Sequence, residues 1–124
     1  QDDAQAVNWY RLAADQGYAS AQYNLGGMYY NGKGVPHDYA QAVKWYRLAA
    51  DQGYASAQFN LGAAYANGQG VPQDDVQAHM WFNLASAQGI KLGESNRDLV
   101  AGKMTPQQIE RAQELARNWK PKKQ

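Results

Sequence analysis

An exact internal repeat is the feature that most constrains this sequence. The fourteen residues WYRLAADQGYASAQ stand at 9–22 and again at 45–58, thirty-six positions later. Over the longer stretches 9–36 and 45–72, only five positions differ. A third copy is recognisable in MWFNLASAQG at 80–89 and then fades. A period of this length indicates a solenoid, in which near-identical units stack and each buries the apolar face of the next.

The first helix of each unit is expected over 38–53 and its copies. Its apolar side chains recur at helical spacing on one broad face, whereas Lys44 and Arg47 fall on the opposite face. An Asp stands before each such helix with a Gln three residues later, as in a capping box. Gly53 is placed to end the helix in a left-handed turn. The Trp-Tyr pair at 45–46 would suit a sugar-binding platform, but at helical spacing it is more typical of a core.

A second helix is expected over about 19–31 and, one repeat later, 55–67. Gly26 and Gly62 lie in its middle, although Gly costs about 1 kcal/mol relative to Ala in a helix interior. Because they recur at the same repeat position, we predict that an aromatic ring from a neighbouring helix lies over the bare backbone.

The segments NGKGVP and NGQGVP follow the second helix of each unit, at 31–36 and 67–72. A Gly-x-Gly phosphate loop needs a strand before it, whereas here a helix precedes and Val-Pro follows. We therefore interpret both segments as turns, with Asn and Gly supplying positive φ angles.

The last part of the chain departs from the repeat. The segment MTPQQIERAQELARNWKP predicts a final helix, with Thr105 as N-cap, Pro106 in the first turn and Gln108 closing a capping box. We expect this helix to cap the solenoid, because a terminal unit must present a polar outer face. Ile109 and Trp119 should be buried on the last repeat, and the basic end RNWKPKKQ should be a solvated tail.

Composition excludes several classes of function. The formal net charge of +1 is too small to drive binding to nucleic acid or to an anionic membrane. The chain has no cysteine, so neither a disulfide nor a thiolate zinc site can form. No run approaches the ~20 apolar residues that span a bilayer, so we expect no membrane insertion. His37 and His79 are not at ligand spacing, and we expect no catalytic residues, metal or cofactor.

The recurring positions resemble the Sel1-like repeat (SLR) family, relatives of the tetratricopeptide repeats. The family pattern joins A-x-x-x-L-G-x-x-Y, a G-x-G-V loop, an Asp, and A-x-x-W-Y-x-x-A-A-x-x-G. The matching residues here are Ala21, Leu25, Gly26, Tyr29, Gly32, Gly34, Val35, Asp38, Ala42, Trp45, Tyr46, Ala49, Ala50 and Gly53. A second set runs from Ala57 to Gly89, with Phe82 in place of the Tyr.

This resemblance implies an all-α fold, an α/α superhelical solenoid of about two to three helix-turn-helix repeats with a C-terminal capping helix. Within a single domain, 1–124, we expect a half repeat at 2–16, repeats at 17–52 and 53–88, a degenerate half at 89–103, a capping helix at 104–120 and a basic tail at 121–124. The resemblance also implies a bacterial, non-enzymatic adaptor that binds a peptide or protein partner in the concave groove. It slightly favours a periplasmic or secreted location and leaves a cytoplasmic one open.

The binding residues are sought among the positions where the two copies differ. Four of these five positions lie in the second helix, and three of the four recur at the spacing of one helix face. In the tetratricopeptide-like arrangement this face lines the concave surface. Rings here would form an aromatic floor, small residues would leave room for a peptide, and the Asn residues at the rim would bond its backbone. The candidate residues are Tyr23, Gly27, Tyr30, Asn31, Phe59, Ala63, Ala66 and Asn67. The alternative is that they only contact a neighbouring helix.

Two other functions remain open at this stage: a non-catalytic or regulatory subunit of an envelope or peptidoglycan-acting enzyme, and a purely structural spacer. A cluster of carboxylates in the groove would favour the first, and a groove without exposed aromatic rings would favour the second. The helix at 2–16 also lacks the helix that should precede it. We therefore expect an uncovered face around Trp9 and Ala13, and weak self-association through this end.

Overall fold

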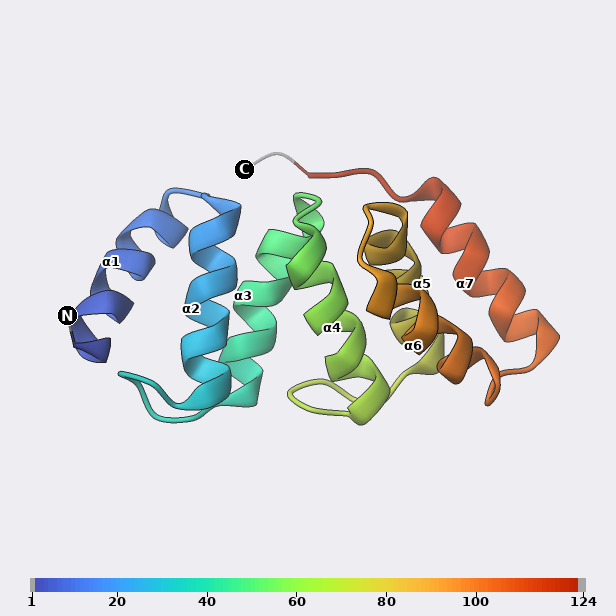
Figure 1. The fold of residues 1–124 in the computed structure, drawn as a ribbon, viewed down its shortest axis with the longest axis horizontal. Coiled ribbons are helices and arrows are strands. Elements are labelled where there is room, and N and C mark those ends of the chain that lie inside the picture. The colour runs from blue at the N-terminus through green and yellow to red at the C-terminus, as the bar shows by residue number, and fades with distance from the viewer. Residues whose placement is uncertain (1, 123–124) are drawn as a thin grey trace.

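Seven α-helices lie side by side in an arched array over residues 2–122, the part of the chain that this computed structural model describes (Figure 1). They are α1 (Asp3–Asp15), α2 (Ala19–Asn31), α3 (Tyr39–Asp51), α4 (Ala55–Asn67), α5 (Asp75–Ala87), α6 (Lys91–Ala101) and α7 (Pro106–Asn118). The all-α fold class is confirmed, and α2 and α4 have the bounds that the repeat predicts.

The helices pack mainly on their neighbours in sequence. α2 packs on α1 and α3, α4 packs on α3 and α5, and α5 packs on both α6 and α7. The tight turns that follow α1 and α3 lie along one edge of the array, and the longer loops that follow α2 and α4 lie along the opposite edge (Figure 1). The tight turns contain Gly17 and Gly53, whose φ angles of 92° and 95° agree with the predicted left-handed helix ends.

Side-chain caps begin four of the helices. The carboxylates of Asp2, Asp38 and Asp74 each accept a hydrogen bond from the backbone N–H three residues later, at 2.7, 3.1 and 3.1 Å. The reciprocal bond that completes a capping box is present at Thr105, whose N–H donates to Gln108 Oε1 at 2.9 Å. The predicted capping boxes at the three Asp residues are therefore only half formed, whereas the one at Thr105 is complete.

Two bare glycines let the helices of a repeat approach closely. The ring of Tyr46 lies over Gly26, and a Cβ atom built on that glycine would be 2.8 Å from Tyr46 Cδ1. One repeat later, a Cβ on Gly62 would be 2.8 Å from Phe82 Cδ1. Real Cβ atoms do not come this close to a ring, so glycine is required in spite of its low helix propensity. The predicted ring above each glycine is confirmed.

This packing yields a test with a control inside the same helix type. Gly62→Ala should lower the free energy of unfolding by about 1–3 kcal/mol, because the added methyl overpacks against Phe82. Gly27→Ala should raise it by up to about 1 kcal/mol through helix propensity, since its Cβ would meet only Tyr46 Oη, at 3.8 Å. Urea denaturation followed by circular dichroism measures both changes. Equal effects of the two substitutions would contradict the role given to the ring.

A glutamine network, which the sequence analysis missed, joins successive helices; Gln22 and Gln58 in it are buried, Gln52 is half-buried and Gln88 is exposed. Gln52 Nε2 donates to Gln22 Oε1 and to the carbonyl of Gly17, both at 2.9 Å. One repeat later, Gln88 Nε2 donates to Gln58 Oε1 at 2.8 Å and to the Gly53 carbonyl at 2.9 Å. Gln22 and Gln58 are buried, and each also donates to a carbonyl of the preceding helix. The same set of glutamine hydrogen bonds therefore occurs twice between α1 and α5, each time within an otherwise apolar interface.

The Gly-x-Gly segments are turns, as predicted, and their glycines have two different tasks. Gly32 and Gly68 end α2 and α4 in the left-handed conformation, with φ of 65° and 66°. Gly70 lies so close to the preceding repeat that a Cβ would be 2.4 Å from the carbonyl oxygen of Tyr39. Among the described residues only glycines have positive φ, so the contribution expected from the Asn residues is wrong. Asn31 is instead the last residue of α2.

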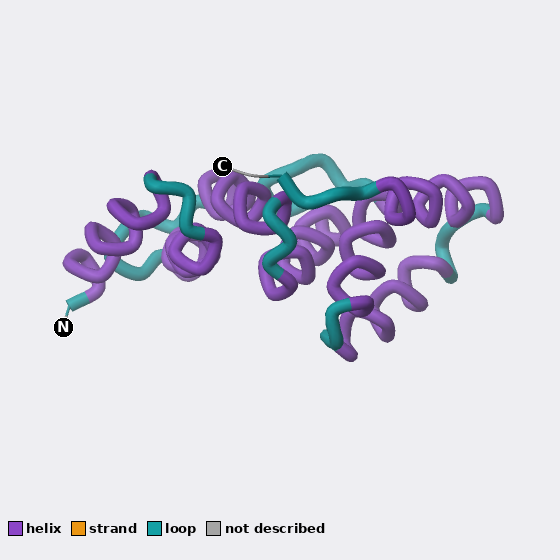
Figure 2. The backbone as a smooth tube through the Cα atoms, turned by 90° about the horizontal axis from the view of Figure 1, so that it is seen from above, coloured by secondary structure: helices purple, strands orange, loops and turns teal. Residues whose placement is uncertain are grey.

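The C-terminal part of the chain closes the array and then turns back over it. Ala112 of α7 is buried, and Leu115, Ala116 and Trp119 pack on the core that α3, α4 and α5 share. The sequence predicts that Ile109 and Trp119 are buried, but both are only half-buried, although Trp119 does pack on the core. The chain after α7 runs back across neighbouring helices (Figure 2). The Lys122 N–H donates to the Asp51 carbonyl at 2.7 Å, so the expected solvated tail is seated on the protein as far as Lys122.

The three tryptophans of the repeat have unequal surroundings. Trp45 and Trp81 are 5% and 3% exposed because each packs on the helix pair before it, whereas Trp9 is 62% exposed. Leu12, next to it on α1, is 58% exposed. The uncovered face expected around Trp9 and Ala13 is present at Trp9, but Ala13 is half-buried against the core and Leu12 is the second exposed residue. We call Trp9 and Leu12 the α1 face below.

Candidate functional site

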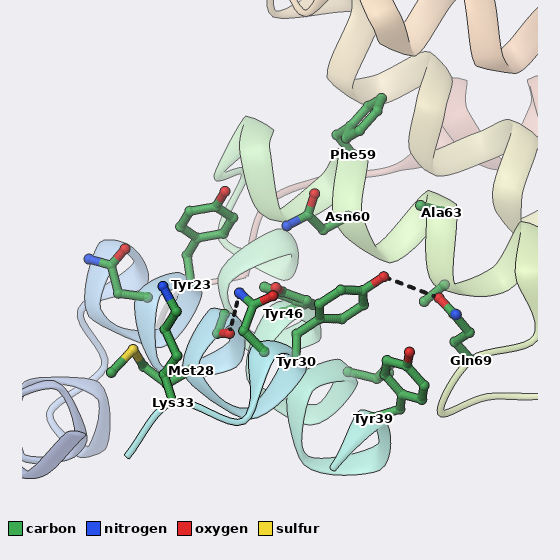
Figure 3. Close-up of a pocket in the computed structure, with 15 residues that line it drawn as sticks. Tyr23, Met28, Tyr30, Lys33, Tyr39, Tyr46, Phe59, Asn60, Ala63 and Gln69 are labelled. Atoms are coloured by element: carbon green, nitrogen blue, oxygen red, sulfur yellow. Dashed lines mark hydrogen bonds between the residues drawn. The ribbon is translucent and has the colours of Figure 1, made fainter. Parts of the chain in front are cut away.

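A pocket of about 540 Å³ lies between α2 and α4, with α3 beneath it (Figure 3). Its size falls in the range of ligand-binding clefts in proteins. It is lined by Tyr23, Asn24, Gly27, Met28, Tyr30, Asn31, Lys33, Tyr39, Val43, Tyr46, Phe59, Asn60, Ala63, Ala64 and Gln69. A smaller pocket of about 240 Å³ continues this surface between α4 and α6. We call the two together the groove.

The groove contains all eight residues proposed from the sequence. The larger pocket contains Tyr23, Gly27, Tyr30, Asn31, Phe59 and Ala63. The smaller one contains Ala63, Ala66 and Asn67 together with Leu99 and Lys103. Ala63 lines both pockets, so they adjoin along α4. The eight residues thus divide between two adjacent hollows rather than forming one floor.

The aromatic side chains of the groove differ in how free they are. The ring of Tyr23 lies 5.8 Å from that of Tyr46 and 5.4 Å from that of Tyr54, and Phe59 lies 5.5 Å from Phe82. Tyr23 and Phe59 are half-buried and also serve the core. Tyr23 and Phe59 therefore contact neighbouring helices, as the alternative to ligand binding predicts, but they also line the groove. Tyr30 is 40% exposed, and its hydroxyl lies 3.4 Å from Gln69 Oε1 across the pocket (Figure 3).

Several groove residues escaped a search based on differences between the copies. Asn24, Asn60 and Asn96 recur every thirty-six positions, and all three line the groove. They are identical in each copy, so only their regular spacing could have revealed them. Lys33 and Gln69 are equivalent residues at the fifth position that differs between the copies. They lie in the loops after α2 and α4, outside the helix face from which the candidates were chosen. Asn31, by contrast, already donates its amide to the Gly27 carbonyl at 3.0 Å.

The electrostatics of the groove are simple. Lys33 and Lys103 are its charged lining residues, one in each pocket, and no carboxylate of the described residues lines either pocket. Burial raises the pKa of Tyr46 to about 12, and a hydrogen bond from Asn60 opposes this only in part. Tyr46 is therefore a neutral phenol at physiological pH. The groove offers aromatic surface, neutral hydroxyl and amide groups, and a weakly positive rim.

The histidines lie outside the groove. His37 is exposed and packs edge-on against Tyr39. His79 occupies the position of Val7 and Val43 in the earlier copies and is 3% exposed, so it lies inside the array. Its Nδ1 has no hydrogen-bond partner within residues 2–122. Among residues 2–122, no three His, Asp or Glu side chains come together in a way that could hold a metal ion.

His79 gives a pH-dependent prediction. Burial, and to a lesser extent the charge of Arg97, lower the pKa of His79 from its ordinary value of 6.5, while Asp98 opposes this. The folded protein therefore has its full stability with respect to His79 above pH 6.5, where this side chain is neutral in both states. As the pH falls below 6.5, the His79 side chain of the unfolded chain takes up a proton first, and the free energy of unfolding decreases. His79→Val, which restores the valine of the earlier copies, should reduce the loss of unfolding free energy between pH 7 and pH 5.

The measurement is urea denaturation at several pH values. His37→Val, which removes the other histidine from an exposed position, is the matched control. Parallel pH profiles for His79→Val and the unmodified chain would show that His79 does not titrate in this way.

The repeats of this chain match the model of a known family. The family model described as Sel1 repeat matches residues 1–18, 19–54 and 55–90. The chain belongs to the Sel1 repeat family. Sel1-repeat proteins are generally non-catalytic scaffolds for protein–protein interaction, and the resemblance found in the sequence is confirmed.

Two solved bacterial structures are similar to this one. A protective antigen of uropathogenic Escherichia coli strains, which displays an SLR fold, is 41% identical with a TM-score of 0.91 over 96% of this chain. A Sel1 repeat protein from Oxalobacter formigenes is 36% identical with a TM-score of 0.77 over 79% of this chain. The chain spans only 26% and 40% of the lengths of these two proteins. A search of curated proteins found no match. Within the described residues, no helix is long and apolar enough to cross a membrane.

Proposed function

We propose that this chain is an interaction scaffold that binds an extended segment of a partner protein in the groove. The observation that carries the proposal is the position of the variable residues. Two repeats that are otherwise nearly identical differ on the face of α2 and α4 that lines the groove. Packing constrains some of the variable positions, such as Tyr23 and Phe59, whereas Tyr30 is exposed and is free to follow the needs of a ligand.

The chemistry of the groove supports a peptide as its ligand. Tyr30 and Tyr39 present ring surface next to the small residues Gly27 and Ala63, which leave room for a side chain. The asparagines that recur along the groove would hydrogen-bond the backbone of a peptide lying in it, since amide groups pair with backbone N–H and C=O groups. A purely structural spacer would have no exposed aromatic ring in the groove, so the exposed ring of Tyr30 favours the binding function.

Tyr30 is the sharpest single test of this proposal. Peptides that bind the chain would first be selected from a displayed random library. Tyr30→Ala should weaken the selected peptides at least about tenfold, the equivalent of 1.4 kcal/mol, because exposed aromatic rings are frequent binding hot spots. The helical content measured by circular dichroism should stay the same, since Tyr30 is 40% exposed and its ring and hydroxyl contact the partly exposed Tyr39 and Gln69.

Tyr18→Ala is the matched control. Tyr18 is 60% exposed and lies outside the groove, so its removal should leave peptide binding unchanged. Phe59→Ala is a less clean variant, because Phe59 also packs on Phe82 and its loss should lower stability. Selected peptides that bind Tyr30→Ala and the unmodified chain equally would place the binding surface elsewhere.

We also propose weak self-association through the α1 face. Exposed apolar surface of this kind is typical of interfaces, and Trp9 is the most prominent part of it. Sedimentation velocity at rising concentration should show reversible association, and the double variant Trp9→Ser, Leu12→Ser should remove it. Leu92→Ser is the control, since Leu92 is 64% exposed on α6 at the other end of the array. A strict monomer at high concentration would overturn this proposal.

A further inference from the structure

Leu99 of α6 is the most exposed of the large hydrophobic side chains that the structure describes, at 72%. It nevertheless lies in a hollow, since it lines the smaller pocket of the groove together with Ala63, Ala66, Phe82 and Val100. A single exposed leucine on a convex surface is ordinary. A leucine that stands open beside other apolar residues in a pocket is surface that a bound side chain would cover, because burial of apolar area favours binding.

Comparison of the repeats shows that the groove changes character towards α6. Along the array, one repeat position gains aliphatic bulk while another loses its aromatic ring. The residues are Gly27, Ala63 and Leu99 at the first position, and Tyr30, Ala66 and Gly102 at the second. The larger pocket is therefore rich in tyrosine rings and amides, whereas aliphatic side chains surround the Phe82 ring in the smaller one. The two pockets suit different ligand side chains.

The charged residues that line the groove are both positive. Lys33 lines the larger pocket and Lys103 the smaller one, and both residues are exposed. Asp98, which precedes Leu99 in the chain, lines neither pocket and pairs with Arg97 at 3.2 Å. The whole chain carries a formal net charge of only +1, so the positive character of the groove is local. Acidic groups of a ligand would complement it.

We propose that the partner segment bound in the groove is acidic and carries an aliphatic anchor, a leucine or isoleucine, that packs on Leu99 in the smaller pocket. Its acidic side chains lie beside Lys103 and Lys33. This inference rests on the function proposed above and names the class of its ligand. Neither Leu99 nor Lys103 is among the eight candidates found from the sequence, because both belong to the copy in which the repeat fades.

An acidic segment of a partner fits this surface better than a second copy of the chain. In a symmetric dimer the same surface of each copy faces the other, so the two Lys103 side chains would come close together. Like charges at such an interface repel each other and oppose the contact. The chain's own C-terminal segment is basic and is already seated on Asp51, where the Lys122 Nζ lies 3.6 Å from Oδ2.

The probe is the set of peptides selected on the unmodified chain from a displayed random library. We expect these peptides to be acidic and to share a leucine or isoleucine. Leu99→Ser should weaken their binding about five- to thirtyfold, since a leucine side chain is withdrawn from an apolar contact. Leu92→Ser is the matched control and should leave binding unchanged, because Leu92 is 64% exposed on the same helix but lines neither pocket. Both leucines are exposed, so both variants should keep the helical content of the unmodified chain.

Two further measurements test for direct contact. Peptides whose leucine is replaced by alanine should bind Leu99→Ser and the unmodified chain equally, as a double-mutant cycle requires of two residues that interact only with each other. Lys103→Glu should weaken binding about two- to fivefold, the size expected for a surface ion pair, and replacement of the contacting acidic residue of the peptide by lysine should restore it. Lys91→Glu makes the same change of net charge on α6, outside both pockets, and should have no effect.

Three results would each overturn the proposal. Selected peptides that are weakened by Tyr30→Ala, but are not acidic or bind Leu99→Ser as well as the unmodified chain, would show that the groove binds a peptide without the anchor and charge proposed here. In that case the proposed function stands and this inference alone fails. A library that yields no peptide dependent on Tyr30 or Leu99 would overturn both. Self-association that is lost in Leu99→Ser would identify a second copy of the chain as the occupant.

Discussion

The contact between an aromatic ring and a bare glycine sets the geometry of the whole array. Tyr46 over Gly26 and Phe82 over Gly62 bring the two helices of each unit closer than any other residue would allow. The helix-propensity cost of about 1 kcal/mol per glycine is offset by ring surface buried against the backbone. The same contact recurs at the same spacing, so successive helix pairs take the same orientation and the array arches in one direction (Figure 1).

This contact also shapes the groove. Tyr46 passes over Gly26, and its hydroxyl would lie 3.8 Å from a Cβ on Gly27, at the floor of the larger pocket. In the next unit Phe82 takes the same position without a hydroxyl and lines the smaller pocket. The core residue therefore decides whether the floor of each hollow carries a polar group. Core and groove are not independent in this protein, because one side chain belongs to both.

Most of the fold could be predicted from the sequence because each structurally important residue occurs at the same position in both copies of the repeat. Gly26 and Gly62 revealed the ring contact, and Asp38 and Asp74 revealed the helix starts. The groove was harder to predict, because a comparison of copies finds only residues that vary. Asn24 and Asn60 are constant, and the network of Gln22 and Gln58 is both constant and buried. Patterns of hydrophobicity treat such a glutamine as surface, since they do not register a partner thirty residues away.

Residues at equivalent repeat positions differ in burial and contacts according to their place in the array. Trp9, Trp45 and Trp81 occupy one repeat position, yet the first is exposed, the second is covered by the preceding repeat, and the third also contacts Trp119. Local sequence cannot distinguish them, because what differs is the neighbour and not the residue. A solenoid thus offers the same surface once per repeat, and each copy becomes core or binding site according to what lies against it. The C-terminal segment covers one such surface, on Asp51 and Gly53.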